Sequence, residues 1–232
     1  VLHDISVTIK PGEKLAVVGP TGSGKSTLIR LLGRFYDFPE DTIFLDDVDI
    51  KNIHSSEVRR RIGVVLQDFH IFSGSVLDNI ILGTSGVTRD DAINAARLVS
   101  ADSFIRELPD GYDTKLVERG QNLSQGERQL LAFARVLAAD PEILVLDEAT
   151  ASIDTETEQL IQQALHQIMT GRTSILIAHR LQTIQEADRI LVLKHGTVKE
   201  LGTHDELMAL GGIYHTLNEL QFQDVSLKND SN

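Results

Sequence analysis

A glycine-rich run near the start of the chain restricts the fold more than any other stretch. Residues 19–27 read GPTGSGKST; the apolar run Leu15–Val18 precedes them and the helix-favouring run Leu28–Leu32 follows. A strand that ends in G-x-x-x-x-G-K-S and continues into a helix is typical of a phosphate-binding P-loop. Its glycines let several backbone N–H groups point at one anion, and the helix N-terminus adds a partial positive charge. The run therefore predicts a nucleoside triphosphate site in an α/β fold.

Every position of this run is a candidate nucleotide contact. An ordinary glycine-rich turn would need neither the strand before it nor the Lys-Ser pair at the start of a helix. We expect Lys25 to reach the β- and γ-phosphates and the Ser26 hydroxyl to bind Mg²⁺. The candidate contacts are Gly19, Pro20, Thr21, Gly22, Ser23, Gly24, Lys25, Ser26 and Thr27.

The composition excludes several classes of function. The 232 residues contain no cysteine, which excludes disulfides, thiolate zinc sites and cysteine nucleophiles. The net charge is 22 − 34 = −12, which argues against a broad nucleic-acid-binding surface, so we expect no nucleic-acid partner. No apolar run approaches the roughly 20 residues that cross a bilayer, so the sequence predicts a soluble domain.

The hydrophobic pattern predicts one domain, over residues 1–232, with two lobes. Four apolar runs have the length and continuity of buried parallel strands: 15–18, 62–66, 143–147 and 174–178. Alternating runs over 1–9 and 42–50 predict an N-terminal antiparallel β portion. We expect a mostly parallel sheet in a nucleotide-binding core, an inserted α-helical subdomain, and a disordered tail. Their predicted bounds are 1–66 with 141–224 for the core, 67–140 for the helical subdomain and 225–232 for the tail.

Four polar residues come directly after buried strands. The carboxyl ends of parallel strands meet at one sheet edge, where α/β proteins bind ligands. There Asp147 is expected to hold Mg²⁺ from the side opposite Ser26, and Glu148 to accept a proton from the attacking water. Gln67 can offer its amide oxygen to Mg²⁺ or to the water, and His179 can donate a hydrogen bond to the γ-phosphate. Any one of them alone could equally be a surface or loop residue, and the edge shared with the P-loop supports the catalytic interpretation.

A second helix start has features of an anion site. Residues 123–129 read LSQGERQ, in which Ser124 and Glu127 have the spacing of a capping box. A serine, a glycine and a helix N-terminus would suit an anion, although the P-loop already serves the phosphates. Two such sites on one chain suggest that the nucleotide is held between two copies.

Taken together, the motifs resemble the nucleotide-binding domain of ATP-binding cassette (ABC) transporters, over essentially the whole chain. GPTGSGKST is similar to Walker A, and LSQGERQ stands where the family has LSGGQ. LVLDEATASID resembles Walker B, the catalytic glutamate and the D-loop, which ends at Asp154, while ILIAHR resembles the H-loop. The resemblance implies a P-loop ATPase that uses ATP and Mg²⁺, with Gln67 as the Q-loop glutamine and a ligand of the metal. It also implies nucleotide contacts from Ser124, Gln125, Gly126, Glu127 and Asp154.

Three further stretches resemble the exporter class of this family. They are residues 34–37, 72–80 and 116–120, the last being similar to the X-loop of exporters. In that class two domains close head to tail over two ATP, with Ser124 and Gly126 of one touching the γ-phosphate bound by Lys25 of the other. The resemblance therefore implies a second nucleotide-binding domain, identical or related, as one partner. It also implies transmembrane domains of the same parent chain, export of a substrate, and a position at the cytoplasmic face of a membrane, with the coupling contact after Gln67.

The chain departs from the family pattern in several places. The aromatic residue that stacks on adenine, expected several residues before the position of Val1, is absent, and the X-loop lacks its usual first half. Gln125 and Glu127 replace a glycine and a glutamine of the signature, and Asp47 replaces a common turn glycine. None of these changes removes a catalytic group, so we expect a competent site.

Two other interpretations stay open from the sequence. The chain could be a soluble ABC ATPase that acts on nucleic acid or ribosomes, although its acidic charge and X-loop count against this. It could also be an inactive module that binds ATP without turnover, although Glu148 and His179 count against that. Six long apolar segments upstream of Val1 would establish the exporter interpretation.

Overall fold

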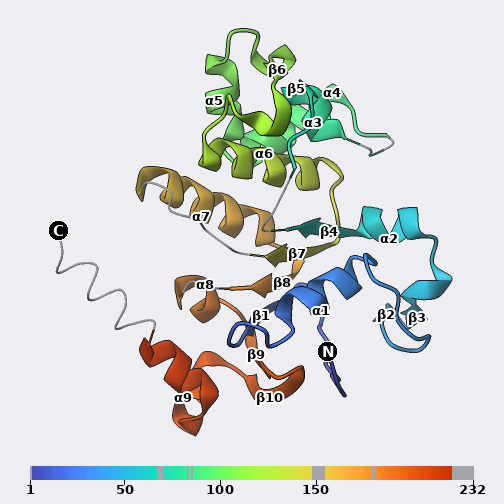
Figure 1. The fold of residues 1–232 in the computed structure, drawn as a ribbon, viewed down its shortest axis with the longest axis vertical. Coiled ribbons are helices and arrows are strands. Elements are labelled where there is room, and N and C mark those ends of the chain that lie inside the picture. Colours follow the sequence, from blue (N-terminus) through green and yellow to red (C-terminus); the bar gives the residue numbers. More distant parts are fainter. Residues whose placement is uncertain are drawn as a thin grey trace. The chain divides into compact units, whose positions relative to one another are not determined.

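The computed structural model describes residues 2–66, 70–82, 84, 86–147, 155–178 and 181–220 (Figure 1). Among these residues the strands are β1 (Lys14–Val18), β2 (Phe44–Leu45), β3 (Val48–Asp49), β4 (Ile62–Val65), β5 (Gly74–Ser75), β6 (Lys115–Leu116), β7 (Ile143–Asp147), β8 (Thr173–Ile177), β9 (Arg189–Lys194) and β10 (Thr197–Gly202). The α-helices are α1 (Lys25–Leu32), α2 (Ser55–Arg61), α3 (Val76–Ile81), α4 (Arg89–Leu98), α5 (Ala101–Glu107), α6 (Gln125–Ala138), α7 (Thr155–Met169), α8 (Leu181–Gln185) and α9 (His204–Leu210), and residues 213–220 are also helical. Short 3₁₀ turns cover Ile50–Asn52, Gly111–Asp113 and Glu118–Gly120. Over the described ranges, no helix combines the length and the apolar character needed to cross a bilayer.

A mostly parallel sheet organises the fold, with the strand order β10-β9-β1-β8-β7-β4. β1 pairs in parallel with β8 on one side and β9 on the other, so that Leu15 lies opposite both Ile175 and Arg189. β10 returns antiparallel to β9. β1 is buried from Leu15 to Val18, which explains why its sequence is continuously apolar rather than alternating. The predicted α/β fold with a mostly parallel sheet is confirmed.

Packing divides the chain into two units, and the first carries the P-loop. It comprises Val1–Ile43, Val145–Ala149 and Arg172–Asn232. Its centre is β1 with its two neighbours β8 and β9, whose apolar side chains are almost fully buried. α9 begins with a capping box, in which the Thr203 N–H donates to the Glu206 carboxylate and the Glu206 N–H donates to the Thr203 hydroxyl.

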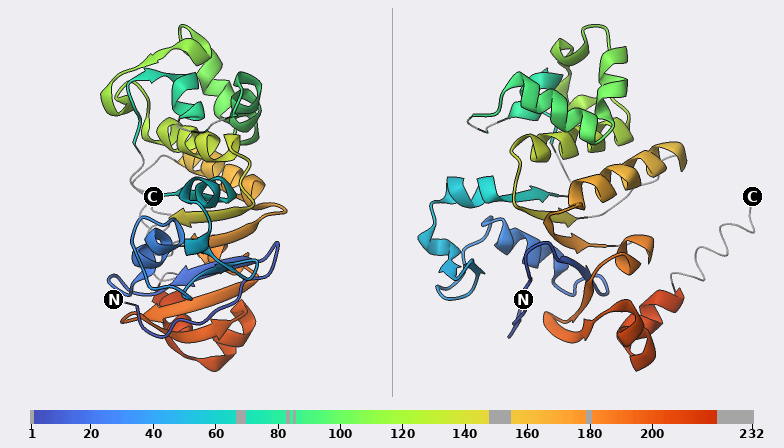
Figure 2. Two further views of the ribbon diagram at one scale, coloured as in Figure 1. Left: turned by 90° about the vertical axis from the view of Figure 1, so that its right-hand side faces the viewer. Right: turned by 180° about the vertical axis from the view of Figure 1, so that it is seen from behind.

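The second unit comprises Phe44–Leu144 and Thr150–Gly171, and α6 lies at its centre. α6 contacts α3, α4, α5, α7 and β4, and the green helices around it can be followed in Figure 2. Most residues of α6 after its first turn are buried, which a 14-residue helix achieves only when neighbours cover several of its faces. The functional division at residues 67–140, which the sequence predicts, remains a prediction.

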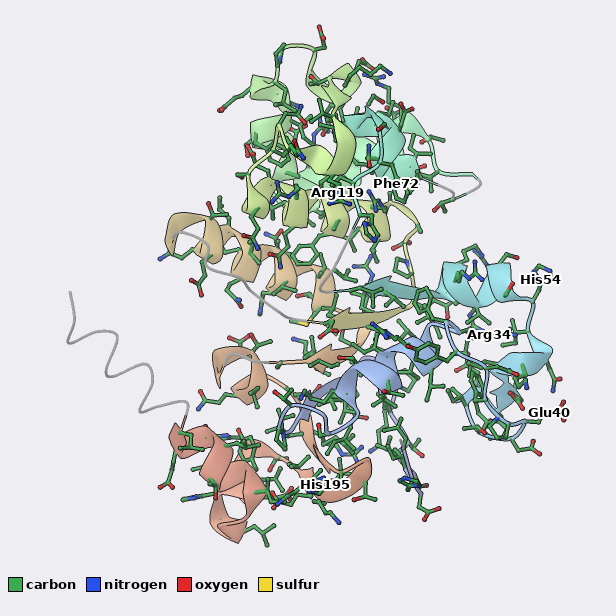
Figure 3. The ribbon with its side chains drawn as sticks, viewed as in Figure 1. Arg34, Glu40, His54, Phe72, Arg119 and His195 are labelled. Atoms are coloured by element: carbon green, nitrogen blue, oxygen red, sulfur yellow. The ribbon has the colours of Figure 1, made fainter. Side chains whose placement is uncertain are left out.

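Two tight hairpins in the chain use the same turn with different residues. Asp46 and Asp47 join β2 to β3 with φ of 49° and 65°, and His195 and Gly196 join β9 to β10 with φ of 51° and 74°. Positive φ at both central residues is typical of a type I′ turn, in which glycine is favoured at the second position. The turn at His195, labelled in Figure 3, has that glycine, whereas the β2–β3 turn has Asp47 in its place.

The strand predicted over residues 1–9 is not formed among the described residues. Asp4 has a φ of 48°, which interrupts extended backbone, although Ile5, Val7 and Ile9 still alternate with exposed neighbours. The antiparallel β portion before residue 50 therefore consists of β2 and β3.

Candidate nucleotide-binding site

The P-loop connects β1 to α1 as the sequence predicts. Gly24 is the residue before the helix, with φ of 109° and ψ of 3°, and as a glycine it makes no side-chain capping hydrogen bond to the first turn. A φ of 109° is strained for residues with a Cβ, so glycine is required here. Because the helix start has no side-chain cap, its first N–H groups are left for a ligand, and the helix dipole favours an anion.

Neighbouring chain segments of the same unit hold the loop in place. The Gly196 N–H donates to the Ser23 carbonyl over 2.9 Å, which ties the β9–β10 turn to the P-loop. A Cβ on Gly19 would collide with the Leu193 carbonyl oxygen, and one on Gly24 would lie 2.5 Å from the Leu2 side chain. The loop is therefore supported from outside by residues far from it in the sequence.

Ser23 provides a test of whether a phosphate fits this loop. The residue is 2% exposed, and its hydroxyl oxygen is buried with no hydrogen-bond partner in the described part of the chain. A buried hydroxyl without a partner is costly and requires an explanation. A phosphate oxygen in the loop would accept a hydrogen bond from this hydroxyl, so the residues present fit the group that the motif predicts.

Lys25 lies across the loop rather than pointing to solvent. Its Nζ donates to the carbonyl oxygens of Gly19 and Pro20, over 2.7 and 3.1 Å. Burial lowers the pKa of Lys25, and the nearby carboxylate of Asp147 partly offsets that effect. The two carbonyl oxygens are neutral acceptors. The β- and γ-phosphates would give the ammonium stronger, charge-assisted hydrogen bonds.

The predicted magnesium ligands Ser26 and Asp147 belong to the same unit as the P-loop. Ser26 is exposed in the first turn of α1, and Asp147 is half-buried at the last position of β7. Mg²⁺ is commonly bound by one or two protein oxygens, with phosphates and water completing the shell. The described residues contain no cluster of three or more acidic or histidine side chains, so they hold no competing all-protein metal cage.

Four predicted site residues, Gln67, Glu148, Asp154 and His179, lie outside the described residues. The three strands that precede them in the sequence are present: β4 ends at Val65, β7 at Asp147 and β8 at Ile177. The roles of these four residues therefore stay predictions.

The capping box predicted at the signature motif is present. Ser124 precedes α6, its hydroxyl accepts from the Glu127 N–H over 3.2 Å, and its own N–H donates to the Glu127 carboxylate over 2.6 Å. Ser124 and Gln125 are exposed, whereas Gly126 is buried. The helix start thus faces solvent, but one of its donors already serves a carboxylate of the same chain.

Two exporter-like stretches that are remote in sequence are paired in the second unit. β5 and β6 are antiparallel, with Gly74 opposite Leu116. A Cβ on Gly120 would lie 3.0 Å from Ile71, so the 3₁₀ turn packs closely on the segment before β5. Arg128 of α6 then donates to the carbonyl of Gly120, over 3.3 Å. The X-loop-like residues therefore contact both the segment that follows Gln67 and the signature helix.

Sequence reasoning missed the residue that fastens that segment to α6. Arg135 donates to the carbonyls of His70 and Asn79, over 2.8 and 2.7 Å, and its guanidinium lies 5.7 Å from the centre of the Phe72 ring. Asn79 in turn is almost fully buried and bonds both backbone groups of Phe72. An arginine within the apolar part of a helix was the available signal, because such a residue needs buried acceptors.

Comparison with known proteins then identifies the chain's relatives. The family described as "ABC transporter" matches residues 2–151. The chain belongs to the ABC transporter family. The uncharacterized ABC transporter ATP-binding protein YknV of Bacillus subtilis is 51% identical over 95% of this chain and 37% of its own length. The probable multidrug resistance ABC transporter ATP-binding/permease protein YheH of Bacillus subtilis is 50% identical over 95% of this chain and 33% of its own length.

A solved structure of an ABC exporter has the same fold as this chain. A bacterial Atm1-family ABC exporter with ATP bound superposes with a TM-score of 0.86 at 43% identity, covering 95% of this chain and 38% of the other. The chain is therefore an ATP-binding ATPase domain of this family. It spans little more than a third of the length of these ABC relatives.

Proposed function

We propose that this domain is the ATP-hydrolysing motor of an ABC exporter, and that two such domains close head to tail over two Mg-ATP. The observation that carries the proposal is the presence of two separate helix starts suited to phosphate. One is the P-loop, with its buried unpaired Ser23 hydroxyl, and the other is the outward-facing start of α6 at Ser124. A second chain that brought its α6 to the first chain's P-loop would complete the site.

Each residue has a distinct task in this proposal. Lys25 and the loop N–H groups bind the β- and γ-phosphates, and Ser26, Asp147 and Gln67 would hold Mg²⁺. The bound metal would neutralise charge that develops on the phosphate oxygens. Glu148 accepts the proton of the attacking water.

The remaining contacts belong to the γ-phosphate and the partner chain. His179 donates a hydrogen bond to the γ-phosphate. Ser124, Gln125, Gly126, Glu127 and Asp154 act across the interface, on the nucleotide of the partner.

The exporter assignment has its own support. Relatives named as ATP-binding/permease proteins are about three times as long as this chain, and the solved neighbour is an exporter. We therefore propose that transmembrane domains of the same parent chain are partners, and that this domain lies at the cytoplasmic face of the membrane. The paired segments 70–80 and 115–120 would receive the membrane domains. The alternative of a soluble ATPase on nucleic acid or ribosomes is not favoured.

Trapping the closed dimer tests the proposal. Glu148→Gln removes the base but preserves the size of the side chain, so the variant is expected to bind ATP, hydrolyse it at least ~100-fold more slowly and accumulate as a dimer. Size-exclusion chromatography with light scattering, with and without ATP, measures this. A variant that keeps full ATPase activity, or stays monomeric at saturating ATP, would contradict the proposal.

A further inference from the structure

Gly126 lies in the first turn of α6, and its backbone conformation does not require glycine. It lies inside an α-helix, and its φ is not among the positive values that the chain adopts elsewhere. Any residue can take that conformation. Glycine is also less favourable than alanine inside a helix, so some neighbour must account for it.

That neighbour is Thr157, in the first turn of α7 and in the same packing unit. A Cβ placed on Gly126 would overlap the methyl carbon of Thr157, with the Cβ and hydroxyl oxygen of the same threonine next, at 3.3 and 3.8 Å. Among the described residues these are the three nearest atoms, and all three belong to the Thr157 side chain. Contacts continue along the two helices.

Gly22 of the P-loop differs from Gly126 in this respect. Gly22 has a φ of 78°, and a Cβ there would meet nothing within 4 Å. Gly22 is therefore explained by backbone conformation, whereas Gly126 is explained by close packing of a neighbouring helix. Gly22 and Gly126 are therefore glycines for different physical reasons.

We infer that Thr157 is a positioning residue for the signature motif, and that its methyl group, rather than the nucleotide, requires glycine at position 126. Its contact locks the first turn of α7 to the first turn of α6. Thr157 stands three positions after Asp154 in the sequence, so the contact ties the helix that follows the D-loop-like sequence to the helix start that carries Ser124. The effect on activity rests on the proposed function, but the contact itself does not.

Paired substitutions test this inference. Gly126→Ala is expected to lower the folding equilibrium constant roughly five- to a hundredfold, as overpacking does. Thr157→Ser removes only the methyl carbon and should restore most of that loss when combined with Gly126→Ala. Thr157→Val keeps a methyl group in that place and should not. Urea unfolding measures all variants. If Gly126→Ala does not fold, the recovery of soluble folded protein with Thr157→Ser but not with Thr157→Val gives the same answer.

A second glycine of the same unit provides the control. A Cβ on Gly63 would lie 2.5 Å from a methyl group of Val136 and 2.7 Å from Pro141. Gly63→Ala should therefore destabilise the protein, and Thr157→Ser should not relieve it. Relief of both alanine variants would show a general effect of Thr157→Ser and would overturn the inference.

ATPase kinetics separate positioning from mere stability. Gly126→Ala is expected to raise KM for ATP and lower kcat, because Ser124 moves with the displaced helix start. The double variant with Thr157→Ser should recover most of the kcat/KM that Gly126→Ala loses relative to Thr157→Ser alone. A double variant that is stable but as inactive as Gly126→Ala would show that the nucleotide itself requires glycine, and would overturn the inference. If the unsubstituted chain proves monomeric and inactive, the proposed function fails, while the unfolding data still report on the contact.

Discussion

The carboxylate of Glu127 lies at the same helix start to which the proposed mechanism brings a phosphate of the partner's ATP. It accepts a hydrogen bond from the Ser124 N–H over 2.6 Å, at the exposed start of α6. A glutamine at this position could accept the same bond through its amide oxygen, without the charge. We therefore predict that Glu127→Gln lowers the ATP concentration needed to close the dimer.

The magnitude follows from the geometry of the helix start. A phosphate that accepts from a neighbouring N–H group would lie roughly 5 Å from this carboxylate, where two unit charges repel by about 0.8–1.7 kcal/mol at an effective dielectric constant of roughly 40–80. That corresponds to about a 4- to 16-fold gain in apparent ATP affinity on removal of the charge. Because such a charge is exposed, the gain should shrink in ~0.5–1 M NaCl. Loss of the carboxylate from the helix start would cost the fold about 0.3–1 kcal/mol.

The assay titrates ATP against the dimer fraction in the Glu148→Gln background, so that hydrolysis does not deplete the complex. The matched control is Glu206→Gln, since Glu206 makes the same capping box with Thr203 at the start of α9, where the bond to its carboxylate is 2.8 Å. Glu206→Gln should cost similar stability and leave ATP affinity unchanged. An unchanged or weaker affinity in Glu127→Gln, or an equal gain in Glu206→Gln, would refute the electrostatic reasoning.

Three further predictions concern other parts of the chain. Lys25→Ala should weaken ATP binding by roughly 10- to 150-fold, the worth of charge-assisted hydrogen bonds, in a titration with a fluorescent ATP analogue; unchanged affinity would remove its phosphate role. Asp47→Gly should stabilise the fold by about 1 kcal/mol in urea unfolding, because Asp47 has a φ of 65° in a turn that favours glycine; a neutral or destabilising result would contradict it. Burial raises the pKa of Tyr214 to about 12, so its contribution to stability is present below pH ~10 and is lost, up to about 2–3 kcal/mol, as the pH rises through 12; Tyr214→Phe should reduce this alkaline loss in pH-dependent unfolding, and an identical profile would contradict the assignment.

Much of the fold was predictable because its strands are continuous apolar runs. β1, β7 and β8 lie where the sequence indicates, since strands in a parallel sheet are buried on both faces and show it in their composition. The strand over residues 1–9 was wrong for a related reason. Its alternating sequence indicates that every second side chain is half-buried. An extended segment that makes no strand-to-strand hydrogen bonds can show the same pattern.

The candidate site was predictable in its local parts and not in its long-range contacts. The P-loop and the capping box at Ser124 are set by residues within a few positions of one another. The support of Ser23 by Gly196, and of the segment after Gln67 by Arg135, depends on pairs that are more than 60 residues apart. The hydrophobic periodicity of the sequence cannot indicate such pairs, because each partner by itself is an ordinary turn glycine or helix arginine.

The position of β1 between β8 and β9 has a consequence for synthesis of the protein. Lys14 pairs with Ser174, 174 − 14 = 160 positions later, so at about 5–20 residues per second β1 waits roughly 8–32 s for a neighbour. The turn that supports Ser23 arrives later still. A nascent chain therefore contains the whole Gly19–Thr27 sequence long before the loop is supported well enough to bind ATP. During that interval its apolar β1 needs protection from aggregation. Translation that stops before residue 196 should yield a product that nucleotide does not protect.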